Sequence, residues 1–454
     1  MKNSCMRQMY MGTIGDMKTL ERHFAHMAEQ GWMIDKIGYF SHRYRAIEPS
    51  GKRFFVDFLP QITAFDYPEN EDAQDYRRFC EDSGWAFVAA NKQFHVFCAK
   101  EDAPEPMPIH TDNAIQARIY LKACRKYEAF PYAFLILVSA LLFALYLSNG
   151  MEAFLSNILI FQMIGFSVFS IGWFWTVGFS ILWYRRAKKA AKLDLPLPTA
   201  NYRLSRARNS TFAACAVVCL VCQFAGVFLE MLGGMPAALL LIFFMPLSGV
   251  GVGLWIRRQI DTKRRNRKSN MRIAIFAIAL MEVALLGIMG VAARQMMAAQ
   301  RISDSLENRP ALTLGALGIT SSPERADTRV KGSVAVPIHY SYWESNHQGN
   351  VHTEVYRPAN KMLAQGLYGR YANELKKGYS DGIGYDCELT CLTPENAAVW
   401  GAETGVAVFN PEGRTSELIL LRGKTLLRLS IYGEGIGAER AAEAVRNLWG
   451  EKAN

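Results

Sequence analysis

The chain has 454 residues, half of them hydrophobic, and carries a formal net charge of +10. The basic excess is confined to two stretches, 183–210 and 257–272, each with eight Lys or Arg and one Asp. Positive charge in short stretches between apolar segments indicates membrane topology, so we expect no nucleic-acid partner. Nine scattered Cys lack the repeated Cys-x-x-Cys spacing of zinc ligands, so neither a metal nor another cofactor is predicted.

The first 103 residues are predicted to form a soluble α+β domain. Asp16 is placed to cap a helix over Met17–Gln30, because its side chain can accept hydrogen bonds from free backbone amides. Gly31 ends that helix as the residue after its C-cap, and Trp32 begins an extended segment. The strands expected in this half are Cys5–Met11, Trp32–Ile37, Phe40–Ile47 and Arg53–Leu59.

The same order of elements returns 53 residues later. Asp75–Ser83 is the second predicted helix, Gly84 ends it, and Trp85 precedes the strands Ala86–Ala90 and Phe94–Ala99. Each Trp is expected to pack where the chain turns from helix to sheet. The two halves together predict an antiparallel sheet that two helices cover on one face.

Several positions in these two halves follow one pattern: Tyr10, Asp16, Leu20-Glu21, Met27–Trp32, Phe55–Phe58 and Ser83–Trp85. The pattern resembles the family catalogued as domain of unknown function 2812 (DUF2812). The resemblance covers about the first 100 residues and rests mainly on two Gly-Trp pairs with a strand between them. It implies a bacterial membrane protein, and it supplies no catalytic residues.

Residues 104–129 are predicted to be an acidic, Pro-rich linker followed by a short basic helix, and residues 130–292 to be the membrane part. Roughly 20 apolar helical residues cross the hydrocarbon core. The second apolar segment is longer than that, so it must tilt, kink or extend beyond the bilayer. Trp173, Trp175 and Trp183-Tyr184 near its end are expected to form an aromatic belt. The five predicted transmembrane helices are 130–148, 154–182, 211–232, 235–256 and 273–292.

Loop charge predicts the orientation of these spans. One basic stretch lies between the second and third spans, and the other lies between the fourth and fifth. Both therefore face the cytoplasm by the positive-inside rule. The odd number of spans then places the N-terminal domain in the cytoplasm and the C-terminal domain outside the cytoplasmic membrane. Since the N-terminus lacks the apolar core of a signal peptide, the first span is expected to act as an uncleaved targeting signal.

Glu282 lies about ten residues into the fifth span. An acidic side chain at that depth costs roughly 2.5–3.5 kcal/mol, so it is a candidate functional residue. Gln162 and Gln223 in other spans are candidate hydrogen-bond partners. The alternative, which we favour, is a protonated carboxyl that ties helices together.

The fourth span contains a Gly-x-x-x-Gly face formed by Gly249 and Gly253. Small residues at this spacing let helices approach closely, either within the bundle or between copies of the chain. A homo-oligomer is therefore one expected assembly beside contacts with membrane lipids. Cys215, Cys219 and Cys222 share one face of the third span and are expected to pack rather than to bind a metal.

Residues 293–454 are predicted to form a second α+β domain. Its main elements are an amphipathic helix over Asn360–Lys377, strands Leu418–Arg422 and Thr425–Ile431 joined by an Arg-Gly-Lys turn, and a closing helix over Gly437–Trp449. Cys387 and Cys391 could form a disulfide if their segment is a loop, whereas regular helix geometry would prevent it.

The sequence contains no phosphate loop, nucleophile elbow or zinc-protease helix, so we expect no enzymatic activity. The leading hypothesis is a membrane sensor or regulator that couples an outer domain to a cytoplasmic domain with a protein partner. The alternative is a transport or export accessory protein that uses the helix bundle.

Overall fold

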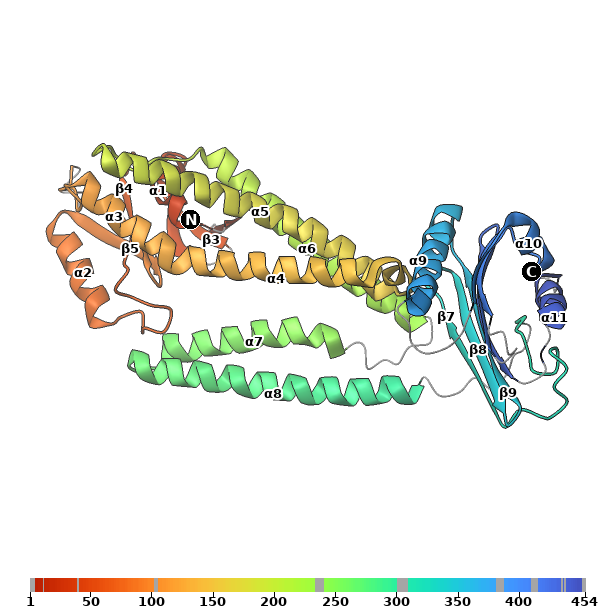
Figure 1. Ribbon diagram of the computed structural model, residues 1–454. Helices are drawn as coiled ribbons and strands as arrows, with labels where there is room; N and C mark the ends of the chain where they lie inside the picture. Colours follow the sequence, from red (N-terminus) through yellow and green to blue (C-terminus); the bar gives the residue numbers. More distant parts are fainter. Residues whose placement is uncertain are drawn as a thin grey trace. The chain divides into compact units, whose positions relative to one another are not determined.

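The structure is a computed structural model (Figure 1). It divides into two compact units. One comprises Met1–Phe143, Ile164–Val221 and Phe243–Gly287, and the other comprises Ala144–Met163, Cys222–Ile242 and Ile288–Asn454. The structure describes residues 5–10, 12–38, 41–101, 105–232, 241–299, 309–380, 388–409, 415–433, 436 and 438–450.

The N-terminal domain consists of two copies of a strand–helix–strand–strand unit. The strands of each copy form a separate antiparallel sheet, in the order β1-β3-β2 for the first and β4-β6-β5 for the second. The first copy is β1 (Cys5–Met9), the 3₁₀ turn η1 (Ile14–Asp16), α1 (Met17–Glu29), β2 (Trp32–Ile37) and β3 (Ser41–Ala46); the second is β4 (Phe54–Phe58), α2 (Glu71–Asp82), β5 (Trp85–Asn91) and β6 (Phe94–Ala99).

The prediction of a single sheet is wrong. Strands β2 and β5 contact each other but are not joined in one hydrogen-bonded ladder. Each of these strands carries a bulge, between Ile34 and Lys36 in β2 and between Phe87 and Ala89 in β5. A bulge increases the local twist of a strand and displaces its backbone groups from the hydrogen-bonded ladder. This accounts for the lack of pairing between the edges of β2 and β5.

The Gly-Trp repeat extends to backbone geometry. Gly31 and Gly84 follow the C-caps of α1 and α2 with φ of +84° and +90°, as predicted for C′ residues. The carbonyl of Gly31 accepts the amide of Ile47 at 2.9 Å, and that of Gly84 accepts the amide of Lys100 at 3.1 Å. These two contacts are 53 residues apart in the chain, so the two copies turn from helix to sheet in the same way.

Replacing Gly84 by Ala is expected to destabilise the N-terminal domain by roughly 1–2 kcal/mol, because a Cβ disfavours the left-handed conformation. Gly51 is a matched control, since a Cβ there meets open space and its φ lies outside that region. The Gly51→Ala change should alter stability by about 0.5 kcal/mol or less. Hydrogen exchange in the α2–β5 segment measures both, and equal effects of the two substitutions would contradict the assignment.

Long helices follow the N-terminal domain. They are α3 (Asn113–Cys124), the π-helical segment η2 (Arg125–Ala129), α4 (Phe130–Asn149), the 3₁₀ segment η3 (Gly150–Leu155), α5 (Asn157–Lys192), α6 (Tyr202–Leu232), α7 (Leu241–Thr262) and α8 (Arg267–Ala299). Within the described ranges four helices are long and apolar enough to cross a membrane: Asn113–Leu155, Asn157–Lys192, Tyr202–Leu232 and Arg267–Ile288. The predicted span 235–256 overlaps residues outside those ranges, so the count of five stays a prediction.

The C-terminal domain is built on one antiparallel sheet with the strand order β10-β11-β12-β13-β9-β8-β7. The helix α9 packs on one face through Leu367 and Tyr371, whereas α10 and α11 pack on the other through Trp400 and Val445. Its elements are β7 (Arg325–Lys331), β8 (Ile338–Asn346), β9 (Gly349–Arg357), α9 (Lys361–Ser380), β10 (Glu388–Leu392), α10 (Pro394–Val399), β11 (Thr404–Phe409), β12 (Thr415–Arg422), β13 (Thr425–Gly433) and α11 (Ala438–Gly450).

The predicted hairpin and amphipathic helix of this domain are present. Strands β12 and β13 pair directly across the turn that contains Gly423, whose φ is +61°. Cys391 lies exposed in β10, where extended backbone replaces the predicted loop or helix. Cys387 lies outside the described residues, so the disulfide stays a prediction.

Candidate functional site

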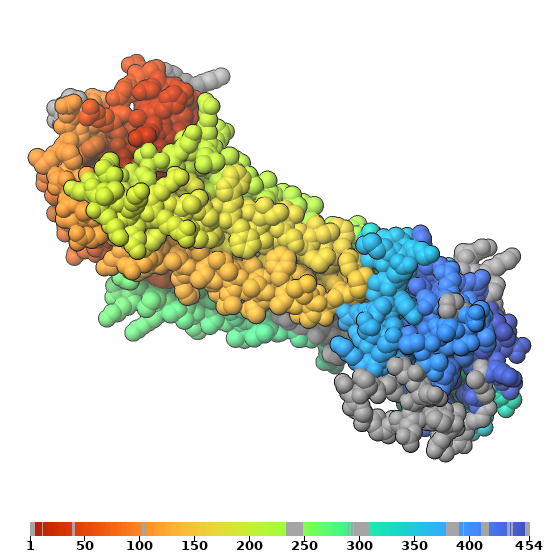
Figure 2. Space-filling model, turned by 45° about the horizontal axis from the view of Figure 1, so that its top comes forward, coloured from red at the N-terminus to blue at the C-terminus, as the bar shows by residue number. Residues whose placement is uncertain are grey.

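The ends of α5 and α6 are built into the core of the N-terminal domain. Trp183 and Ala187 of α5 and Leu197 of the following loop are buried in the same apolar cluster as Phe24 of α1. Trp183 donates from Nε1 to the carbonyl of Pro198 at 3.0 Å. In Figure 2 the red and orange atoms of the N-terminal domain lie directly against the yellow-green atoms of these helices.

This packing corrects the predicted aromatic belt. Trp183 is only 6% exposed, and Tyr184 packs against the same cluster, so both side chains pack against protein rather than against membrane lipid. A Cβ on Gly15 would come within 2.9 Å of the Trp183 ring, which shows how closely η1 approaches α5. The physical reason is length: α5 has 36 residues, about 54 Å, and therefore extends well beyond a 30 Å hydrocarbon core.

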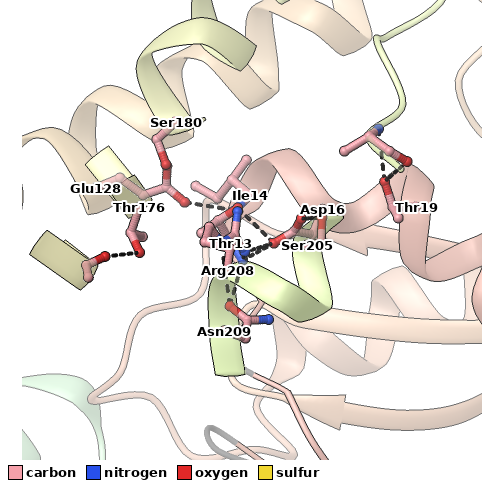
Figure 3. A network of polar contacts seen from close by, with 12 residues as sticks. Thr13, Ile14, Asp16, Thr19, Glu128, Thr176, Ser180, Ser205, Arg208 and Asn209 are labelled. Carbon is pink, nitrogen blue, oxygen red and sulfur yellow. Dashed lines mark hydrogen bonds and ion pairs between the residues drawn. The ribbon is translucent and has the colours of Figure 1, made fainter. Parts of the chain in front are cut away.

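A buried ion pair joins the N-terminal domain to α6 (Figure 3). Arg208 donates from Nη2 to Oδ2 of Asp16 at 2.7 Å, and the two residues are 1% and 0% exposed. Ser205, one turn earlier on α6, donates to the other carboxylate oxygen at 2.8 Å. The guanidinium also lies 4.2 Å from the ring centroid of Phe179. A pair this well enclosed is costly to break on one side only.

Asp16 occupies the predicted N-cap position of α1, but its side chain makes no capping hydrogen bond there. The carboxylate instead accepts the backbone amide of Thr13 at 2.8 Å and the hydroxyl of Thr13 at 2.9 Å. Glu128, in the π-helical segment, accepts the amide of Ile14 at 2.7 Å. The η1 turn is therefore held by acidic side chains between α6 and the start of α4.

Further contacts attach the first copy to the α5–α6 hairpin. The His23 ring of α1 stacks on Tyr202 of α6 with a centroid separation of 3.8 Å. Thr19 exchanges hydrogen bonds with the backbone of Ala200, donating at 3.1 Å and accepting at 3.0 Å.

The second copy binds a different helix pair. Lys92, in the β5–β6 turn, donates to Asp261 of α7 at 3.1 Å, and Arg257 of α7 donates to Asn91 at 3.2 Å. Asn270 of α8 donates to the carbonyl of Phe65 at 2.9 Å and is 1% exposed. The first copy thus contacts the α5–α6 hairpin, and the second copy contacts α7 and α8 through its β5–β6 turn and its β4–α2 loop.

A buried carboxylate ties the second copy to α3. Asp57 of β4 accepts hydrogen bonds from Tyr120 of α3 at 2.8 Å, from His110 at 3.1 Å, and from Tyr76 of α2. Burial alone would raise the pKa of Asp57, but the hydrogen bond and charge of His110, with the two tyrosine hydroxyls, lower it below its usual value. Tyr120 itself is fully buried, so α3 is part of this domain's core.

Residues 16–131 match the family model described as "Protein of unknown function (DUF2812)". That segment belongs to the DUF2812 family. It begins at Asp16, includes Asp57 and Glu128, and ends at the start of α4. No curated protein and no solved structure matches the chain.

The sequence-predicted signature residues lie in two places. Asp16 is in the ion pair with α6, whereas Gly31, Gly84 and the two Trp lie at the helix-to-sheet turns of the DUF2812 segment. Trp85 is buried and donates from Nε1 to the carbonyl of Met107 at 2.9 Å, and Trp32 is half-buried.

The candidate membrane residues belong to two different compact units. Glu282 is exposed on α8 and belongs to one compact unit, whereas Gln162 and Gln223 belong to the other. Their proposed hydrogen bonds therefore stay predictions. Within the described residues no group of three or more His, Cys, Asp or Glu is placed to hold a metal ion.

Sequence reasoning missed Arg208, Asn270 and Lys92 because Arg208 is one of eight basic residues in its stretch and no local pattern marks the other two. One signal was available: Trp183, Ala187 and Ala190 recur at helical spacing beyond the predicted end of the second span, and all three are buried. An apolar stripe that continues past the bilayer length indicates packing against protein rather than lipid.

The C-terminal domain has its own attachment to α5 within the second unit. Asn157, the first residue of α5, accepts the amide of Val334 at 2.8 Å and donates to the carbonyl of Gly332 at 3.4 Å. Its backbone amide donates to Glu230 of α6 at 3.0 Å. Arg370 of α9 pairs with Glu152 of η3 at 3.4 Å and also donates to a carbonyl of the α4 end. The start of α5 is thus fixed by both α6 and the turn before β8 in the C-terminal domain.

The DUF2812 segment should lose stability in mild acid because three histidines are buried in it. Burial lowers the pKa of His23, His42 and His95 to about 4, below the ordinary value near 6.5. Between these values the unfolded chain binds protons that the folded domain does not, so stability present above pH 6.5 falls as pH drops toward 4. Each of the three histidines should lower the free energy of unfolding by about 2 kcal/mol at pH 5.

The control for this prediction is His26, which is exposed on the outer side of α1. Hydrogen exchange of the β3 and β6 peptides at pH values from 7.5 to about 5, corrected for intrinsic exchange, measures the loss. His42→Leu should weaken the acid dependence and His26→Gln should not. An acid dependence that is the same in both variants would refute the role of buried histidine.

Proposed function

We propose that this chain is a multi-pass protein of the cytoplasmic membrane that acts as a sensor or regulator without enzymatic activity. The DUF2812 domain, on the cytoplasmic side with a protein partner, would set or report the relative position of two helix pairs. The observation that carries this proposal is the division of contacts: Asp16–Arg208 joins the first copy to α6, and Phe65–Asn270 joins the second to α8.

Helix α5 supplies the connection between the outer and inner domains in this proposal. Its first residue, Asn157, is bonded to the C-terminal domain, and its last turns around Trp183 are buried in the DUF2812 domain. A continuous helix of 36 residues is stiff on this scale, so a displacement at one end is transmitted to the other. The basic stretches 183–210 and 257–272 support the assigned orientation by the positive-inside rule.

The coupling is tested by measuring the distance between the two helix pairs. Spin labels at the exposed positions Lys189 of α5 and Lys268 of α8 report it by electron–electron double resonance in nanodiscs. We expect one narrow distribution in the parent chain and a broader or shifted one after Arg208→Met. The exposed Arg206→Met is the matched control on the same helix. A distribution that does not change on Arg208→Met would overturn the proposal.

A further inference from the structure

A groove of about 500 Å³ lies on the seam between the two copies of the DUF2812 domain. Its walls come from β2 with its partner strand and from β5 with its partner strand, the two edges that contact without pairing. Four pairs of lining residues are equivalent, 53 positions apart: Met33 and Ala86, Ile34 and Phe87, Asp35 and Val88, Arg45 and Cys98. The groove therefore follows the internal symmetry of the domain, with a bulge on each side.

The two walls differ in chemistry although they are equivalent in position. On the first copy, Asp35 pairs with Arg43 at 2.5 Å, and Arg45 adds an exposed guanidinium to that wall. On the second copy the equivalent positions carry Val88 and Cys98, so that part of the groove is apolar, and Lys100 and Glu101 line the wall beyond it. At these positions the repeat has diverged from charged to apolar side chains.

The end of the groove adds further positive charge. Lys52 lines it and pairs with Glu101 at 3.2 Å, but the Glu101 side chain is 91% exposed, so water screens that pair strongly. Lys100 also lines the groove, and its ammonium group donates to the backbone carbonyl of Glu81 at 2.7 Å. Because that carbonyl is neutral, it does not compensate the charge of Lys100. Cationic side chains together with an apolar part of the groove are the features that bind an amphiphilic anion.

We propose that this groove binds a small amphiphilic anion, an apolar body that carries a carboxylate or sulfonate. The anionic group would contact Arg45 and Lys52, and the apolar body would cover Val88 and Cys98. The volume lies in the usual range for small-molecule sites, roughly 300–1,000 Å³.

A ligand at the seam would change the relation between the two copies. Because each copy contacts a different helix pair, occupancy of the groove would be felt at α6 and α8. That regulatory role rests on the proposed function above, whereas binding itself does not. Binding and its effect on the helices are therefore measured separately.

The binding test uses the full chain in nanodiscs and 2-naphthoate as the probe, with the cation 2-naphthylmethylamine as its counterpart. Hydrogen exchange is followed in the peptides that contain β2 and β5. We expect saturable protection by 2-naphthoate in both peptides and none by the amine. Arg45→Gln should weaken the apparent affinity roughly tenfold or more, since a charge-assisted contact is lost, and Val88→Asp should abolish it.

Arg78→Gln is the control, because Arg78 is exposed on α2 and does not line the groove. Unfolding of Arg45→Gln would appear as lost protection throughout the domain; Lys52→Gln then serves as the second variant. Absence of protection by 2-naphthoate, equal protection by the amine, or equal affinity of the Arg45 and Arg78 variants would each overturn the proposed site.

The regulatory step is read from the same spin-label pair, Lys189 and Lys268, with and without 2-naphthoate. A ligand-dependent change in the distance distribution supports regulation through the seam. Protection of the groove without any change in distance would retain the binding site and reject its coupling to the helices.

Discussion

Replacing Trp183 by Ala is expected to destabilise the DUF2812 domain by about 3–5 kcal/mol, the usual cost of removing a buried Trp side chain. The residue lies on α5, outside the matched family segment, yet its ring packs against η1 and the domain core. Hydrogen exchange of the α1 peptide in the full chain measures the local free energy of opening. The loss should appear there although the substitution is more than 150 residues away in sequence.

Trp175→Ala is the matched control, since that side chain is on the same helix and 40% exposed. It should leave exchange in α1 nearly unchanged, within about 0.5 kcal/mol. If Trp183→Ala also leaves α1 exchange unchanged, the end of α5 is not part of the domain core.

The second large effect concerns the buried ion pair. Arg208→Met leaves the carboxylate of Asp16 buried beside Ser205 without its cation, which should cost about 3–5 kcal/mol. Asp16→Leu should cost a similar amount because it strands the guanidinium. The double variant should be more stable than the sum of the two single losses predicts, since neither charge remains.

A double-mutant cycle in urea, followed by exchange of the α1 and α6 peptides, measures the coupling. Arg206→Met, two residues away on the exposed face of α6, controls for loss of charge alone. Additive effects of Asp16→Leu and Arg208→Met would mean that the two residues do not interact.

Much of the fold could be predicted because its signals are local. Helix ends at Gly31 and Gly84 follow from left-handed C′ geometry, and the repeat follows from the spacing of the Gly-Trp pairs. Apolar length predicts helices that cross a membrane. The turn at Gly423 follows from the two flanking strands.

The rest depends on long-range contacts that local patterns do not contain. Asp16 and Arg208 are 192 positions apart, and Arg208 is one of eight basic residues in its stretch, so nothing in the sequence singles it out. The prediction of an aromatic belt was wrong at Trp183. An aromatic residue at the end of a span is equally compatible with a membrane interface and with a protein core. The sequence predicted one sheet in the N-terminal domain instead of two, because the residue pattern of a strand does not show which other strand pairs with it.

Cross-linking tests most directly the claim that each copy of the DUF2812 domain binds its own helix pair. Cysteines at Thr19 and Ala200 and, separately, at Phe65 and Asn270 replace residues in direct hydrogen-bond contact. A short bifunctional thiosulfonate applied to native membranes should link both pairs, with single-cysteine variants as controls for the native thiols. The exchanged pairs, Thr19 with Asn270 and Phe65 with Ala200, should not link. Efficient linkage of the exchanged pairs, or none in the matched pairs, would contradict this account.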